Sequence, residues 1–114
     1  MEEQLQIDQE ELIQAWKQEL PNFLNEGDSS DVTAGAGPQS LRINIQVAGR
    51  SKYDLDFDCT YMDTREVKVE RVDVEKDNRS VDEHTEIIQN LVDDYIRLIH
   101  ECAQSLKKLT TANV

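Results

Sequence analysis

The sequence is poor in the residues that most often carry catalysis, hold a metal or build a disulfide framework. Its 114 residues include two histidines, two cysteines and few aromatic side chains. We interpret Cys59 and Cys102, far apart among apolar neighbours, as small buried hydrophobes of a reducing compartment. His84 and His100 lack the ligand spacing of a zinc site, and the sequence has no G-x-S-x-G motif. We therefore predict a protein that is not an enzyme, with no catalytic residue, no metal and no cofactor.

Long hydrophobic runs are also missing. No apolar run exceeds two residues, which is far below the length of a membrane span. The segment "MEEQLQIDQEE" is acidic where a secretory signal needs positive charge. These absences predict a cytoplasmic protein with no membrane contact.

Basic residues are scarce, with 12 Lys and Arg against 24 Asp and Glu and a net charge of −12. Residues 1–38 hold nine acidic residues against one basic residue, a balance of −8, and residues 39–114 hold fifteen against eleven, a balance of −4. Such a surface repels phosphates, so we expect no direct binding of nucleic acid.

Residues 8–24 carry the signals of a first helix. Asp8 and Glu11 form a capping box, and Ile7 and Leu12 stand at the positions of a hydrophobic staple. Apolar residues then recur at helical spacing until Pro21, which ends or kinks a helix. Residues 26–39, "EGDSSDVTAGAGPQ", are short, polar or small, which predicts a flexible linker, either functional or disordered.

Three strands of an antiparallel meander are predicted at residues 40–48, 52–61 and 65–75 because apolar and polar residues alternate there. In the third strand, Val67 and Val69 have one parity whereas Val72 and Val74 have the other. One face of a regular strand cannot bury both pairs, so we predict a bulge or break near Glu70–Arg71. The alternative is a strand whose far end is buried on both faces.

Residues 80–108 are predicted to form a long second helix that begins with the capping box of Ser80 and Glu83. At about 1.5 Å per residue this helix would extend beyond a nine-residue strand. We thus expect an α+β fold in one domain, residues 1–114, with two layers in the order α-β-β-β-α: a three-stranded antiparallel meander with two helices on one face. Double-stranded-RNA-binding domains share this order but need a basic entry to the second helix, where this chain reads "SVDEHTE".

Asp54, Asp56 and Asp58 occupy alternate positions of the second predicted strand. A tight hairpin would place Arg42 opposite Asp58 and Asn44 opposite Asp56, and a following turn would bring Lys68 close to Asp58. The spacing fails the EF-hand pattern, which needs Gly where Cys59 stands. A pair of metal ions on Asp-x-Asp would need a third carboxylate from Glu66 or Glu70 and a basic cradle for the substrate. We favour a solvated strand face.

The long helix carries a wide apolar stripe, which is either absorbed by the protein's own sheet and first helix or used as an interface. We expect a non-enzymatic small acidic protein-binding module, an adaptor, chaperone or inhibitor, which binds a protein partner with a basic surface and forms a homodimer through this helix. The alternative is an acidic nucleic-acid mimic that inhibits a basic DNA- or RNA-binding protein. The candidate partner-binding residues are Ile88, Leu91, Val92, Tyr95, Ile96, Ile99, Asp54, Asp56, Glu10 and Glu11.

Overall fold

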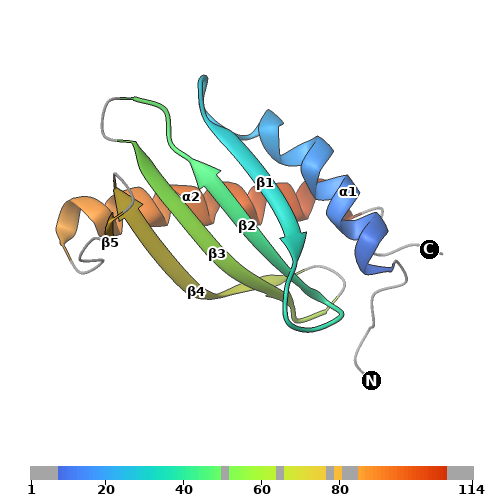
Figure 1. Ribbon diagram of the computed structural model, residues 1–114. Coiled ribbons are helices and arrows are strands. Elements are labelled where there is room, and N and C mark those ends of the chain that lie inside the picture. The colour runs from blue at the N-terminus through green and yellow to red at the C-terminus, as the bar shows by residue number, and fades with distance from the viewer. Residues whose placement is uncertain (1–7, 50–51, 64–65, 77–78, 81–84, 108–114) are drawn as a thin grey trace.

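Five antiparallel strands and two α-helices make up the computed structural model, which describes residues 8–49, 52–63, 66–76, 79–80 and 85–107 (Figure 1). The elements in chain order are α1 (Gln9–Glu19), the 3-10 helix η1 (Leu20–Asn22), β1 (Ser29–Ala34), β2 (Ser40–Gln46), β3 (Tyr53–Tyr61), β4 (Val67–Lys76), β5 (Arg79–Ser80) and α2 (Glu86–Ser105). The predicted α+β class with an antiparallel sheet and two helices is confirmed. The predicted number of three strands is wrong, because β1 and the two-residue β5 extend the sheet at its two edges.

Both helices contribute to one hydrophobic core with the side chains of a single face of the sheet. Figure 1 shows α2 crossing behind the strands and α1 beside β1. Alternate residues of β2 and β3 point into this core, as the period of two requires. The fully buried large side chains are Leu12, Trp16, Leu20, Val32, Leu41, Ile43, Ile45, Leu55, Phe57, Val74 and Ile99.

Helix α1 begins as its sequence predicts. Asp8 is the N-cap, and its side chain accepts a hydrogen bond of 2.9 Å from the backbone N–H of Glu11. The helix ends at Glu19, and η1 with Pro21 takes the place of the predicted last turn. Ile7, predicted to form the staple, lies outside the described residues.

The prediction of a flexible linker at 26–39 is wrong, because this segment contains β1. The strand pairs antiparallel with β2, and Val32, which lies opposite Ile43, is fully buried. The side chain of Gln9 holds the following turn by donating to the carbonyls of Gly37 and Ser40 at 2.8 and 2.9 Å. Because β1 has one core residue, its sequence shows almost no hydrophobic pattern. The strand forms because the edge of β2 supplies hydrogen-bond partners for its backbone.

The bulge predicted near Glu70–Arg71 is confirmed. Cys59 of β3 lies opposite Val69, whereas its neighbour Asp58 lies opposite Arg71, so Glu70 is the extra residue. The shift returns the later valines of β4 to the core side, and Val74 is 2% exposed. The alternative of a strand end buried on both faces is therefore unnecessary.

Helix α2 begins later than predicted. Thr85 is its N-cap, whereas Ser80 belongs to β5 and residues 81–84 lie outside the described residues. Its 20 residues span about 30 Å at 1.5 Å per residue, and the ten residues of β4 span about 34 Å. The described helix is thus shorter than predicted, but it crosses the strands obliquely, and its first turn extends past β4 and β5, as the predicted overhang requires (Figure 1).

Candidate functional site

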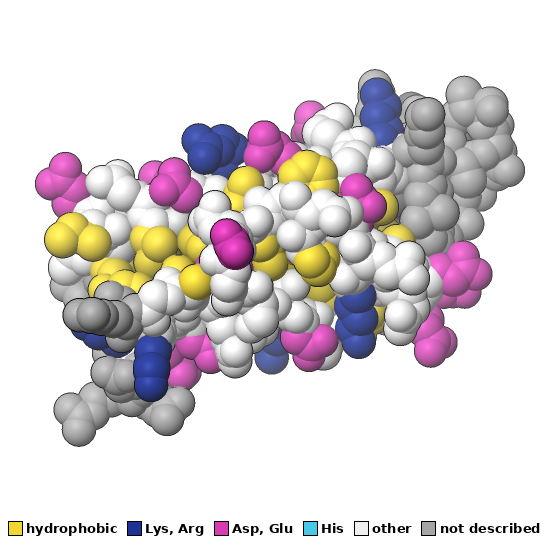
Figure 2. Space-filling view, turned by 90° about the horizontal axis from the view of Figure 1, so that it is seen from above, with side chains coloured by type: hydrophobic (Ala, Val, Ile, Leu, Met, Phe, Trp, Pro, Cys, Tyr) yellow, Lys and Arg dark blue, Asp and Glu magenta, His cyan; other side chains and the backbone are white. Residues whose placement is uncertain are grey.

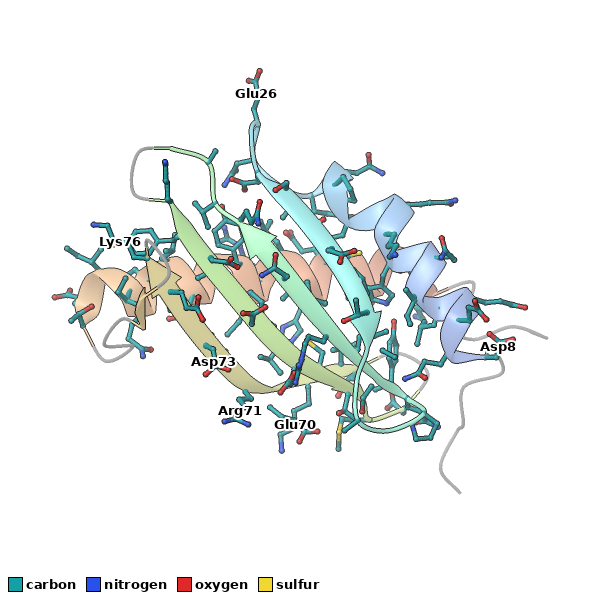
Figure 3. All side chains as sticks on the ribbon, in the orientation of Figure 1. Asp8, Glu26, Glu70, Arg71, Asp73 and Lys76 are labelled. Carbon is teal, nitrogen blue, oxygen red and sulfur yellow. The ribbon has the colours of Figure 1, made fainter. Side chains whose placement is uncertain are left out.

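The face of the sheet opposite the helices, called the outer face below, is polar over its whole described area. Figure 3 shows side chains with oxygen and nitrogen ends along the front of β2, β3 and β4. The large hydrophobic side chains that are exposed in the described residues, Met62 and Ile87, lie outside these strands. The outer face of the described strands therefore presents charges and hydrogen-bonding groups.

One row across the outer face is neutralised by arginine. Asp58 lies between Arg42 on β2 and Arg71 on β4 in the strand register, and Arg42 Nε donates to Asp58 Oδ1 at 3.0 Å. This hydrogen bond and the charge of Asp58 raise the pKa of Arg42 above its ordinary value. The predicted pairing of Arg42 with Asp58 is confirmed, but the expected approach of Lys68 is not observed. Lys68 lies opposite Thr60, before the bulge, and Arg71 takes the position opposite Asp58 after it.

The next two rows bring four carboxylates together. Asp54 lies directly opposite Glu75, and Asp56 lies directly opposite Asp73. Like charges that face each other across two strands destabilise a sheet. We call these four residues, Asp54, Asp56, Asp73 and Glu75, the carboxylate square. Its two sides are on β3 and β4, and Figure 3 labels Asp73 on its β4 side.

A neutral amide, rather than a cation, steadies the β3 side of the square. Asn44, opposite Asp56 as predicted, donates through Nδ2 to Oδ1 of Asp54 and, at 2.9 Å, to Oδ1 of Asp56. The ion pairs among the described side chains join Lys17 with Asp31, Arg42 with Asp58 and Arg97 with Asp94. None of these ion pairs includes a carboxylate of the square, although the charges of Asp56 and Asp73 contribute to the raised pKa of Arg42.

The described residues contain no group of three or more His, Cys, Asp or Glu side chains placed to hold a metal ion. His100 is exposed on α2, and His84 lies outside the described residues. Both cysteines are buried in the core, and burial raises the pKa of Cys59 and of Cys102 to about 12. These thiols are therefore protonated and shielded at neutral pH.

An open pocket of about 550 Å³ adjoins the square at the end of β2 and the start of β3. Asp54 belongs to both the square and the pocket wall. Val47, Ala48 and Tyr53 also line it, of which Val47 and Tyr53 pack against the core, and Gln46 and Lys52 add polar groups. The outer face thus has a flat acidic part and a concave part of mixed character side by side.

The predicted partner-binding residues separate into three places. Most of the helix set is used by the core: Ile88, Val92, Tyr95 and Ile99 are at most 7% exposed, and Leu91 and Ile96 are partly buried. Ile87, next to this set, is 76% exposed. Figure 2 shows a band of hydrophobic side chains along the face of the molecule seen from above, with charged side chains on both sides of it.

The acidic candidates lie on two different layers. Glu10 and Glu11 are exposed on α1 in the helical layer, whereas Asp54 and Asp56 are half-buried on the outer face. Sequence reasoning missed Asp73 and Glu75, the other half of the square. The predicted bulge held the necessary signal, since counting forwards along β4 from Arg71, opposite Asp58, places both residues beside β3 aspartates.

Comparison with known proteins gives no match to a family model, to a curated protein or to a solved structure. Within the described residues no helix has both the length and the apolar character needed to cross a membrane.

Proposed function

We propose that this protein is a non-enzymatic, acidic protein-binding module of the cytoplasm, an adaptor, chaperone or inhibitor, that holds a basic partner protein. The observation that carries the proposal is the pair of directly opposed carboxylates, Asp54 with Glu75 and Asp56 with Asp73. Opposed carboxylates are expected to cost stability in the free protein, and a cation brought by a partner would turn that cost into attraction. The net charge of −12 would also steer a basic partner from a distance.

The test is capture of partners from a native lysate on immobilised protein, followed by titration of each purified partner at rising salt. We expect the specific partner to be basic and its affinity to fall steeply with ionic strength, because exposed charges are screened beyond about 10 Å at 0.1 M salt. Partners whose affinity does not change with salt would overturn the electrostatic basis of the proposal.

A nucleic-acid mimic remains the second candidate, favoured by the regular spacing of Asp54, Asp56 and Asp58 along β3 at roughly 6.8 Å for every second residue. Asp58 is, however, neutralised by Arg42, so the negative line ends after two charges. A compact acidic square fits a small basic surface of a partner better than an extended site that binds a row of phosphates. A competition experiment distinguishes the two candidates. Double-stranded DNA would displace this protein from a partner only if this protein occupied the partner's nucleic-acid-binding site.

Self-association through α2 is a separate proposal, supported by the exposed Ile87 beside the half-buried Leu91. We expect light scattering at tens of micromolar to give a dimer that Ile87→Glu converts to a monomer. Wild-type protein that is already monomeric under these conditions would exclude this contact.

A further inference from the structure

The outer edge of β4 is paired along only a small part of its length. In the described part of the chain, β5 pairs with Glu75 and Lys76, and no strand lies against the edge of Val67–Val74. At the opposite border of the sheet, by contrast, α1 lies beside β1 (Figure 1). An unpaired strand edge presents backbone donors and acceptors that can pair with a strand of another chain.

The phase of the hydrogen bonds shows which backbone groups of β4 face this edge. Where β3 turns into β4, the N–H of Met62 donates to the carbonyl of Glu66 at 2.9 Å. In an antiparallel pair every second residue directs both its N–H and its C=O to the same neighbour. Following the register from this bond, Arg71 and Asp73 direct these groups to β3, whereas Val72 directs its own to the open edge.

The first half of the edge is protected against pairing, and the second half is regular. Lys68 and the bulge at Glu70 are features that keep strand edges from joining other strands. From Arg71 onwards the register with β3 is continuous. Val72 is half-buried, whereas Val74, the next residue on the same side of β4, is 2% exposed. A strand added at this edge would therefore remove the exposed part of Val72 from water.

The charges on the two sides of Val72 have opposite signs. Arg71 precedes it and Asp73 follows it, both side chains are exposed, and Figure 3 labels both at the β4 border of the sheet. Neither takes part in an ion pair among the described side chains. Asp58, which lies opposite Arg71, already accepts a hydrogen bond from Arg42, and Asp73 lies opposite another carboxylate. Both residues can therefore gain a partner of opposite charge.

This order of charges makes the edge complementary to itself. In an antiparallel pairing about a twofold axis at Val72, this valine lies opposite Val72 of the second copy, and Arg71 lies opposite its Asp73 on both sides of the axis. We propose that two copies of this chain associate through this edge and join their sheets into one. The two Val72 residues exchange a pair of backbone hydrogen bonds, and both flanking pairs carry opposite charges, which stabilise a strand pair. This contact is independent of the basic partner proposed above.

The experiment measures self-association of the full chain by sedimentation equilibrium. The range is about 10 to about 500 µM at about 0.15 M salt, where repulsion between two acidic copies is screened beyond about 8 Å. We expect a monomer at the lower end and a growing fraction of dimer toward the upper end. Hydrogen exchange of the Val72 amide should slow as the concentration rises, whereas exchange at the edge of β1 should not change.

Two charge variants identify the contact. Arg71→Asp makes both positions beside Val72 acidic, and Asp73→Arg makes both basic. We expect each variant alone to associate about tenfold or more weakly than the wild type, because like charges then face each other across the axis. An equimolar mixture should form a heterodimer, since every opposed pair again has opposite charges. Both variants remain acidic overall, so net charge cannot bring them together. Asp31→Arg, a matched reversal on β1, should associate like the wild type.

A further variant tests the backbone without changing a charge. Val72→Pro removes the N–H that faces the edge, and proline is tolerated at an edge strand where its missing N–H faces away from the sheet. We expect it to be folded by circular dichroism and monomeric. A dimeric Val72→Pro protein would overturn the strand pairing.

Three other outcomes would also overturn the proposal: a wild type that is monomeric at every concentration, a dimer that persists in both charge variants, or folded charge variants whose mixture stays monomeric. A dimer that only Ile87→Glu disrupts would assign self-association to α2 instead.

Discussion

The indole N–H of Trp16 donates a hydrogen bond of 3.0 Å to the hydroxyl of Tyr61, and the two rings meet edge to face at 82°. The residues are 45 positions apart, so this contact ties α1 to the end of β3. Both side chains are buried, Trp16 at 0% and Tyr61 at 3% exposure. Burial is the largest cause of the raised pKa of Tyr61, whose hydroxyl therefore stays neutral.

Removing this hydroxyl should destabilise the fold. Tyr61→Phe leaves the buried indole N–H without an acceptor, so we expect the free energy of unfolding to fall by about 1–3 kcal/mol. Urea denaturation followed by the fluorescence of Trp16, the single tryptophan, measures the loss. The matched control is Tyr53→Phe, at a half-buried tyrosine whose ring contacts Lys76, which should change stability by less than about 0.5 kcal/mol. Equal effects of the two variants would contradict the role of this bond.

Asp28 joins three parts of the chain and should be equally sensitive. Its carboxylate accepts from the hydroxyl of Tyr95 at 2.6 Å, from the N–H of Ala48 at 2.7 Å and from the N–H of Asn25 at 3.1 Å. Asp28→Asn cannot satisfy all three donors, so we expect a loss of about 2 kcal/mol. In contrast, Asp31→Asn removes only an exposed ion pair of 3.8 Å and should cost less than about 0.5 kcal/mol. Thermal melts of the two variants provide the comparison.

The same substitution at neighbouring positions of the outer face should have opposite effects. Asp73→Asn relieves repulsion with Asp56, so we expect about 0.2–1 kcal/mol of added stability at low salt and less at high salt. Asp58→Asn weakens the pairing with Arg42 and should lower stability instead. Urea midpoints at two ionic strengths test the sign of each change. A loss of stability in Asp73→Asn would show that the square is neutralised in the free protein.

Stability should decline at alkaline pH. Burial raises the pKa of Cys59 and of Cys102 from about 9 to about 12, and that of Tyr95 from about 10 to about 12. At a pH between the ordinary and the raised pKa, each of these groups is therefore protonated in the folded state and deprotonated in the unfolded chain. The stabilisation is complete below about pH 9 and is lost as pH rises toward 12, with a slope of up to about 1.4 kcal/mol per pH unit for each group. Tyr95→Phe should reduce the slope above pH 10, and unchanged slopes would contradict this assignment.

Deleting Glu70 should leave a folded protein, because it converts the bulge of β4 into a regular strand with the same residues facing the core. Deleting Asp73 removes one residue from the same strand but turns Val74 outward and Glu75 inward, so we expect it to unfold the protein. Circular dichroism and thermal melts distinguish the two deletions. A folded Asp73 deletion would mean that the register of β4 is weakly specified.

Particular residues show which features the sequence carried. Asp8 with Glu11 marked the start of α1, and the parity change between Val69 and Val72 marked the bulge. These signals are local, because a cap and a side-chain period act within a few residues. Arg42 could be placed opposite Asp58 because a tight hairpin sets its own register.

Tertiary contacts decided the rest. The segment of β1 has a single core residue, Val32, and becomes a strand because β2 offers an unpaired edge and α1 covers its inner side. Its membership in the sheet was therefore invisible in the local pattern. Likewise, the helical spacing of apolar residues is the same whether a sheet or a partner covers them. Only the fold assigns Ile88, Val92 and Ile99 to the core.

The sequence by itself determined the α+β class, the acidic character and the face on which the β3 aspartates lie, because periodicity and charge are properties of neighbouring residues. Only the tertiary structure decided that Asp73 and Glu75 meet those aspartates across the strands. That meeting depends on one extra residue at Glu70, which sets the register between two strands and so determines where opposite and like charges come together.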